Sequence, residues 1–154
     1  MTSASRTALA FPSAAWVRAC GAAIDTSAAY RTAAANWTYG AVALVVRSAP
    51  DLGLAEPVAL WLELDRGRCH GARLVSATDA TGASFEISAD YTTWKAVLRR
   101  ELQPVAGIMR GKLTLRGSLA IVVRNIATAE ALVEAATTVP TSFLDEKRVR
   151  RSGG

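Results

Sequence analysis

The hydrophobic periodicity of this chain changes from helical to alternating and back, and this pattern constrains its fold more than any other feature. Trp16, Cys20 and Ile24 recur at helical spacing. Residues 58–65 then place an apolar side chain at every second position, as in a half-solvated strand. Helical spacing returns over residues 94–102. The order predicts an α+β domain, in which helices from both ends of the chain cover one face of a mostly antiparallel sheet.

Polar or proline residues precede each helical pattern and predict where the helices begin. We expect helices starting at Ser13, within residues 25–27, and at Asp90, Pro104, Ser118 and Thr128. The second helix is expected to carry Trp37 on its apolar face, and Pro140 is expected to follow the end of the last helix.

Five segments are predicted to form strands: residues 37–46, 58–65, 69–77, 84–88 and 112–116. Asp65 to Arg68 predict a hairpin turn, because Gly67 adopts positive φ without steric cost. Residues 79–82 are expected to form a second turn.

The length of 154 residues favours one domain, and the charge divides it unevenly. Of the net charge of +5, +3 comes from residues 146–154 and only +2 from residues 1–145. We expect a single domain over 1–145 and a disordered basic tail over 146–154. No aromatic residues alternate with the tail's charges, so we expect no nucleic-acid partner but a transient contact of the tail with an anionic membrane surface.

The N-terminus lacks the apolar core of a signal peptide, and the longest apolar runs, such as 41–46, are far shorter than a membrane span. A cytoplasmic location is therefore expected. Abundant alanine and arginine suggest a bacterial genome rich in G and C.

The chain offers little material for catalysis or metal binding. Cys20 and Cys69 form no C-x-x-C motif, and neighbouring Cys69 and His70 would point to opposite faces of a strand. His70 is the only histidine, and no G-x-S-x-G, phosphate-binding loop or dinucleotide motif occurs. We expect buried free cysteines, no catalytic residue, no metal and no cofactor.

Residues 84–135 combine a branched strand, a helix centred on Trp94, a P-x-x-x-x-M-x-G-K-L-x-L-x-G segment and closing helices. The positions that carry this pattern are Trp94, Pro104, Met109, Gly111, Lys112, Leu113, Leu115 and Gly117. This stretch resembles the C-terminal half of the SCP-2 sterol-carrier-like (sterol-binding) domain, and a looser likeness extends over residues 12–138. Arg99, Arg100, Gln103 and Ser118 depart from the family pattern, which leaves the polar contacts open.

The resemblance implies a mixed, mostly antiparallel five-stranded sheet covered on one face by helices, with an apolar tunnel between the layers. Such a tunnel would accept a fatty acid, an acyl-CoA, a sterol or a polyketide-like molecule. The candidate ligand-binding residues are Phe85, Ile87, Trp94, Leu98, Ile108, Met109, Leu113, Leu115, Leu119 and Val122.

Three functions remain open at this point. The first is a small lipid carrier that transports its ligand. The second is a cavity enzyme of the cyclase or isomerase type, acting on a hydrophobic intermediate by proximity and desolvation. The third is a non-catalytic accessory module of a lipid-modifying complex. Ionisable groups converging in the cavity would favour the enzyme, and an apolar wall would favour the carrier. The sequence does not predict the oligomeric state.

Overall fold

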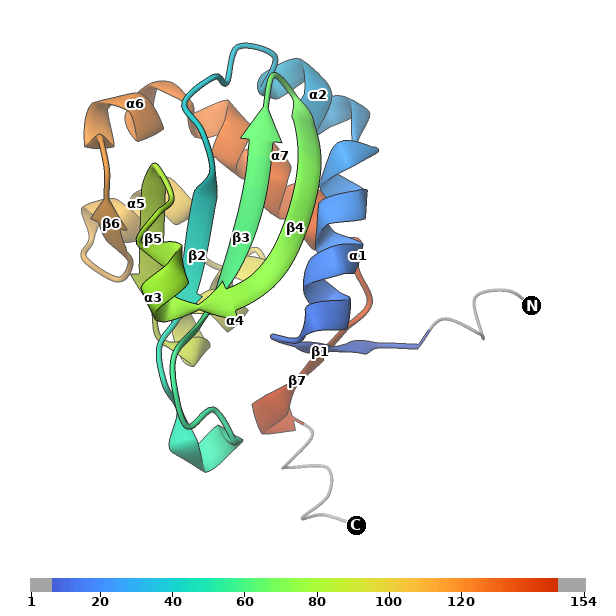
Figure 1. Ribbon diagram of the computed structural model, residues 1–154, viewed down its shortest axis with the longest axis vertical. Coiled ribbons are helices and arrows are strands. Elements are labelled where there is room, and N and C mark those ends of the chain that lie inside the picture. Colours follow the sequence, from blue (N-terminus) through green and yellow to red (C-terminus); the bar gives the residue numbers. More distant parts are fainter. Residues whose placement is uncertain (1–6, 147–154) are drawn as a thin grey trace.

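A computed structural model describes residues 7–146 and arranges them as a main sheet with helices packed mainly against one of its faces, and a second, two-stranded sheet (Figure 1). In chain order the elements are β1 (Leu9–Phe11), α1 (Ala14–Asp25), α2 (Ala28–Ala33), β2 (Val42–Val46), the 3-10 helix η2 (Pro50–Leu52), β3 (Val58–Asp65), β4 (Arg68–Ser76), α3 (Ala77–Ala80), β5 (Phe85–Ala89), α4 (Tyr91–Leu98), α5 (Pro104–Met109), β6 (Thr114–Arg116), α6 (Leu119–Arg124), α7 (Ile126–Ala136) and β7 (Thr141–Phe143). Among these residues no helix combines the length and apolarity needed to cross a bilayer.

The main sheet has five strands in the order β4-β3-β2-β5-β6. Strands β2 and β5 run parallel, and the other neighbouring pairs are antiparallel. The expected mixed five-stranded sheet and α+β class are therefore confirmed. Arg66 and Gly67 join β3 to β4 with φ values of 50° and 82°, and positive φ at both central residues suits a tight hairpin.

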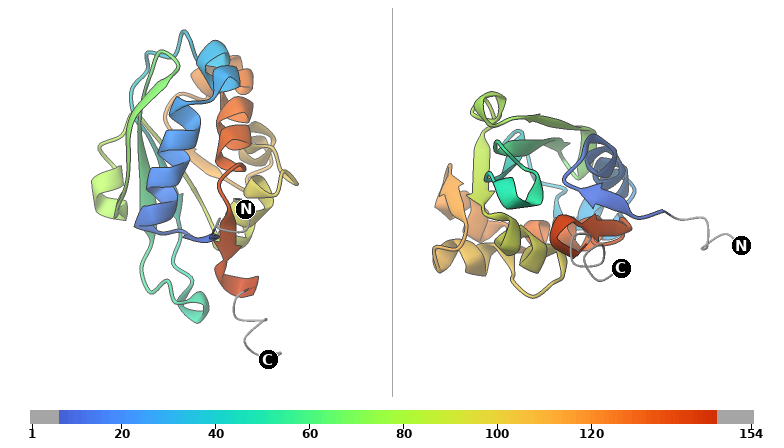
Figure 2. Two further views of the ribbon diagram at one scale, coloured as in Figure 1. Left: turned by 90° about the vertical axis from the view of Figure 1, so that its right-hand side faces the viewer. Right: turned by 90° about the horizontal axis from the view of Figure 1, so that it is seen from below.

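Helices α1 and α7 lie on one side of the sheet, and the short helix α3 lies on the other (Figure 2). Alanines permit the close approach of α3, because Ala43 and Ala59 of the sheet are fully buried with Ala80 in a small second core. The turn expected at residues 79–82 was therefore an incomplete description. Ser76 accepts a hydrogen bond from the Asp79 N–H at 3.0 Å and caps a helical turn there.

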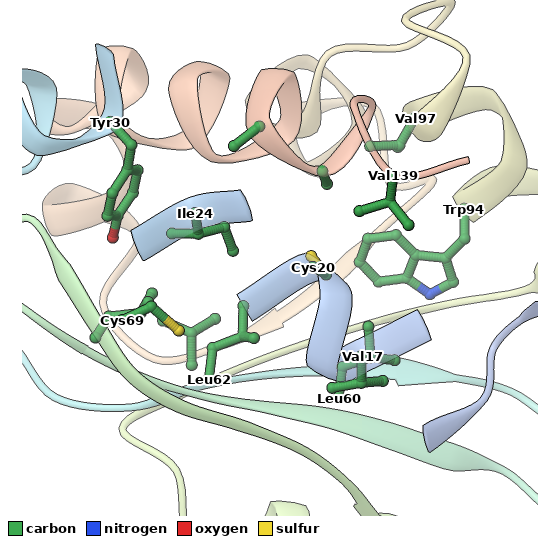
Figure 3. Close-up of a cluster of buried hydrophobic side chains, with 14 of the residues drawn as sticks. Val17, Cys20, Ile24, Tyr30, Leu60, Leu62, Cys69, Trp94, Val97 and Val139 are labelled. Carbon is green, nitrogen blue, oxygen red and sulfur yellow. The ribbon is translucent and has the colours of Figure 1, made fainter. Parts of the chain in front are cut away.

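Helix α1 forms the centre of the main core (Figure 3). Ser13 caps it as expected, accepting a hydrogen bond from the Trp16 N–H at 3.1 Å. Its buried side chains include Val17, Cys20 and Ile24, which lie between the sheet and α7. Both cysteines are free and buried, which confirms that expectation. Helix and sheet are so close at Gly21 that an added Cβ would lie 2.5 Å from the Ala72 Cβ.

Several predicted boundaries were wrong. Helix α2 ends at Ala33, so Trp37 follows the helix, and its strand begins only at Val42. Helix α7 begins at Ile126, before the expected cap Thr128. The Thr128 hydroxyl is buried and donates to the Ala33 carbonyl at 2.9 Å, so a tertiary contact uses the group that was expected to cap the helix.

Strands β1 and β7 were not predicted. They pair in parallel, with Leu9 opposite Thr141 and Phe11 opposite Phe143, and join the two ends of the described chain. The basic tail predicted over 146–154 lies outside the described residues except for Glu146.

Candidate functional site

An apolar cavity of about 100 Å³ lies between the sheet and the helices on its main face. Its lining residues come from the α2–β2 connection, three strands, α4, α5, α6 and α7 and their connections. They are Trp37, Val42, Leu44, Leu64, Phe85, Ile87, Trp94, Val97, Pro104, Val122, Asn125, Thr128, Ala129, Leu132 and Val133.

The parallel register of β2 and β5 builds the floor of the cavity. Val42 lies opposite Phe85, and Leu44 lies opposite Ile87. Because side chains alternate along a strand, these four point to the same face. Glu86, between the two β5 residues, instead accepts a hydrogen bond from Arg116 at 3.0 Å.

Helix α4 supplies the largest side chain of the roof. Asp90 caps the helix by accepting a hydrogen bond from the Thr93 N–H at 2.8 Å. The buried Trp94 indole N–H donates to the Val45 carbonyl at 2.8 Å. With its one polar atom paired in this way, the ring contributes apolar surface to the cavity.

Two polar side chains from the α6–α7 region also line the cavity. Thr128 donates its hydroxyl hydrogen to Ala33, as described above. The Asn125 amide nitrogen donates to the Ile121 carbonyl at 2.7 Å, which leaves the amide oxygen as an acceptor. None of the fifteen lining residues, all within the described chain, has a side chain that ionises near neutral pH.

Three further hollows share residues with this cavity. A 40 Å³ space under α1 shares Leu44, Trp94, Val97, Leu132 and Val133 with it. A hollow of about 260 Å³ between α5 and α7 shares Pro104 and Ala129. A polar hollow of about 130 Å³ shares Val97, Pro104 and Val133, and adds Arg100, Gln103 and Glu130. The main cavity thus has apolar space on one side and a polar surface on another.

Neither cysteine lines the main cavity, although Cys20 lines the small space under α1, and burial disfavours the thiolate form of both. Desolvation, with a smaller effect from Cys69, raises the pKa of Cys20 to about 12. Burial likewise raises the pKa of Cys69. Thiolates are the reactive form, so neither residue is suited to nucleophilic chemistry. Within residues 7–146 there is no group of three His, Cys, Asp or Glu side chains that could hold a metal ion.

Six of the ten predicted ligand-binding residues line the main cavity or one of its neighbouring hollows. Phe85, Ile87, Trp94 and Val122 line the main cavity. Leu98 lines the small space under α1. Met109 lines the outer hollow between α5 and α7, and it is 65% exposed.

The other predicted residues do not line these spaces. Leu113 is buried, and Ile108 and Leu115 are partly buried against the core. Leu119 is exposed on α6. A ligand-binding role for all ten remains a prediction.

Several lining residues were absent from the predicted site. Val42 and Leu44 lie on the predicted strand, and the alternation of that strand could have assigned them to its helical face. Ala129, Leu132 and Val133 have helical spacing on α7 and could have been found in the same way. Trp37 was expected on the apolar face of the second helix, but it follows the end of α2 and lines the cavity from the connection to β2.

A sheet whose helical face encloses an apolar cavity defines a class of α+β proteins with an internal site. The sequence profile described as the SCP-2 sterol transfer family matches residues 22–130. The chain belongs to this family. No curated protein sequence matches.

Solved structures agree with this assignment. The chain is similar to a crystal structure of sterol carrier protein 2, with 38% identity, a TM-score of 0.77, and coverage of 82% of this chain and 97% of that one. It is also similar to a conserved hypothetical protein, possibly sterol carrier protein, from Thermus thermophilus, with 37% identity, a TM-score of 0.78, and coverage of 90% and 94%. Sterol carrier protein 2 from Yarrowia lipolytica shares the fold at 13% identity and a TM-score of 0.51, with coverage of 80% and 88%.

Proposed function

We propose that this protein is a small lipid-binding or carrier protein that holds a hydrophobic ligand in the internal cavity. The observation that carries the proposal is the apolar cavity between sheet and helices. Each ligand methylene buried there contributes roughly 0.8 kcal/mol. Membership of the SCP-2 sterol transfer family supports the same function.

The size of the cavity bears on how a ligand fits. Ligand sites usually enclose about 300–1,000 Å³, which is larger than the 100 Å³ of this cavity. A fatty acid, sterol or polyketide-like molecule would therefore also occupy neighbouring space, and the hollow between α5 and α7 is the largest of the three described above. Ligand entry would then separate α5 from α7.

The polarity of the wall favours carriage over chemistry. An enzyme of the cyclase or isomerase type would be expected to place ionisable groups around its substrate, and the lining residues supply only Asn125 and Thr128 as polar side chains. An ionised headgroup, such as that of a fatty acid or acyl-CoA, would stay outside, in the hollow that contains Arg100 and Gln103.

The proposal includes a cellular location and a role for the basic tail. The two buried free thiols suit a reducing bacterial cytoplasm. The basic tail would add a transient attraction to anionic membranes.

Native mass spectrometry and uptake of a fluorescent fatty acid test the proposal. Ala129 lines the main cavity, whereas Ala127, two residues earlier on α7, is exposed. Ala129→Phe should fill the cavity and lower uptake at least about tenfold. The matched Ala127→Phe variant should bind as the wild type does.

The urea unfolding midpoint shows whether each variant is folded, and Ala129→Val provides a smaller block if Ala129→Phe does not fold. Equal uptake by folded Ala129 and Ala127 variants would remove the cavity as the site. Wild-type protein that carries no lipid and takes up no fatty acid would argue instead for an accessory module.

A further inference from the structure

Exposed apolar side chains gather on one part of the molecule. Within residues 7–146, four of the five large hydrophobic side chains that are exposed belong to the short segment from α5 to the start of α7. They are Met109 (65% exposed), Leu119 (42%), Val123 (40%) and Ile126 (40%). Leu119 and Val123 are four residues apart on α6 and therefore share one face of the helix. We call these four residues the apolar edge.

The same segment carries only positive charge. Residues 103–129 contain four basic residues, Arg110, Lys112, Arg116 and Arg124, and no Asp or Glu. Arg116 pairs with Glu86 at 3.0 Å. In the described chain the other three have no carboxylate oxygen within 4.0 Å.

The apolar edge lies beside the candidate ligand site. Elements α5, β6 and α6 lie together at the β6 end of the sheet (Figure 1). Met109 and Ile126 both line the 260 Å³ hollow between α5 and α7. That hollow shares Pro104 and Ala129 with the main cavity, so the apolar edge borders a space through which the cavity could open.

We propose that the apolar edge docks on a membrane surface that contains anionic lipids. Apolar side chains next to unpaired cations are the pattern of segments that lie in a membrane interface. Each cation near an anionic surface contributes attraction, and each apolar side chain buried among the acyl chains adds hydrophobic energy. This surface borders the hollow between α5 and α7 that adjoins the main cavity. Docking there would let a lipid move between bilayer and cavity with little exposure to water.

Vesicle co-sedimentation tests the electrostatic part. Wild-type protein should bind vesicles of phosphatidylcholine with about 30% phosphatidylglycerol and bind pure phosphatidylcholine vesicles much more weakly. The double variant Arg110→Gln/Lys112→Gln should lose roughly 30-fold in partitioning to the anionic vesicles. The control Arg18→Gln/Arg73→Gln removes the same charge from α1 and β4, at the opposite edge of the sheet, and should bind as the wild type does.

Substitution of the apolar side chains distinguishes membrane binding by the apolar edge from binding by the basic tail, because every variant retains the tail. Leu119→Ser/Val123→Ser should lower binding to anionic vesicles by at least about tenfold, whereas binding through charges of the tail alone would not change. An environment-sensitive fluorophore on Val123→Cys should shift to the blue on anionic vesicles, and one on Arg18→Cys should not. Native Cys20 and Cys69 are buried and should not react with the label.

Three results would overturn the proposal. Two of them concern vesicles: equal binding of the wild type to neutral and anionic vesicles, and unchanged binding of both Arg110→Gln/Lys112→Gln and Leu119→Ser/Val123→Ser. The third is a wild-type dimer that dissociates when Leu119 and Val123 are replaced by Ser. The last result would assign the edge to a second copy of the chain. Arg110 and Lys112 line neither the main cavity nor its neighbouring hollows. Uptake of the soluble fluorescent fatty acid by Arg110→Gln/Lys112→Gln should therefore remain at the wild-type level, so failure of docking is distinguishable from failure of ligand binding.

Discussion

Two buried tyrosines differ in what their hydroxyl groups contact. In the described chain the Tyr30 hydroxyl is fully buried and has no hydrogen-bond partner. The Tyr91 hydroxyl donates to the Phe11 carbonyl at 2.6 Å and accepts from the Leu144 N–H at 2.9 Å. Burial raises the pKa of Tyr91 to about 12, so this hydroxyl stays protonated and able to donate.

These contacts predict that the same substitution affects stability differently at the two positions. Tyr91→Phe leaves two backbone groups unpaired and should lower the free energy of unfolding by about 1–3 kcal/mol. Tyr30→Phe removes an unpaired polar atom and should change it by less than about 0.5 kcal/mol or raise it. Urea unfolding of both variants measures the difference, and a larger loss for Tyr30→Phe would contradict this account.

Single residues also show why the candidate site was only partly predictable. Phe85, Ile87 and Trp94 were predicted because strand alternation and helical spacing place them on inward faces. Met109 and Leu119 follow the same apolar spacing, but α5 and α6 are short helices at the margin of the molecule. A local pattern cannot show that nothing covers an apolar face.

At the scale of elements, an ion pair joins the end of α1 to the start of β4. Asp25 accepts hydrogen bonds from the Arg68 Nε and Nη2 at 2.7 and 3.0 Å, and from the Cys69 N–H at 2.9 Å. The Arg68 hydrogen bonds, followed by that from Cys69, hold the pKa of Asp25 well below its usual range.

This contact predicts a pH dependence of stability. A carboxylate whose pKa is lower in the folded state stabilises the fold above its unfolded pKa of about 3.9, and the stabilisation disappears as the pH falls. At pH 7 the free energy of unfolding of the wild type should therefore exceed that of Asp25→Asn. The difference should be at most about 1 kcal/mol, because the ion pair is partly exposed.

That advantage should shrink as the pH falls from about 5 towards about 2. Urea unfolding across this range provides the measurement, with Asp51→Asn on η2 as the control, which should follow the wild type. An advantage that is constant with pH would show that the Asp25 charge is not responsible.

Elements differ in how far the sequence predicts them. Helices α1, α4 and α6 begin where Ser13, Asp90 and Ser118 were expected to cap them, because capping is a local interaction. Strands β1 and β7 have three residues each and are paired across nearly the whole chain. Such pairing leaves no periodic signal in either segment.

At the scale of the whole molecule, the C-terminal segment closes the domain. Thr141 accepts a hydrogen bond from the Trp16 indole N–H at 2.9 Å. Lys95 pairs with Asp145 at 2.9 Å and with Glu146 at 3.1 Å, and Arg99 also pairs with Glu146. Glu146 thus belongs to the folded domain, one residue beyond the boundary expected from charge alone.

Two truncations test this boundary. Removal of residues 147–154 should leave the unfolding midpoint and fatty-acid uptake unchanged. Removal of residues 139–154 deletes β7 and the ion pairs, and should lower the free energy of unfolding by several kcal/mol or prevent folding. Thermal unfolding followed by circular dichroism compares the two, and equal midpoints would contradict the closing role of β7.

The pairing of β1 with β7 also has a consequence for synthesis of the protein. Leu9 is among the first described residues to leave the ribosome, but its partner Thr141 is among the last. Until β7 has been synthesised, the core around Phe11 is incomplete, because β1 has no partner strand. Completion of the domain therefore requires synthesis of the chain through β7, and contacts so distant in sequence slow its last folding step.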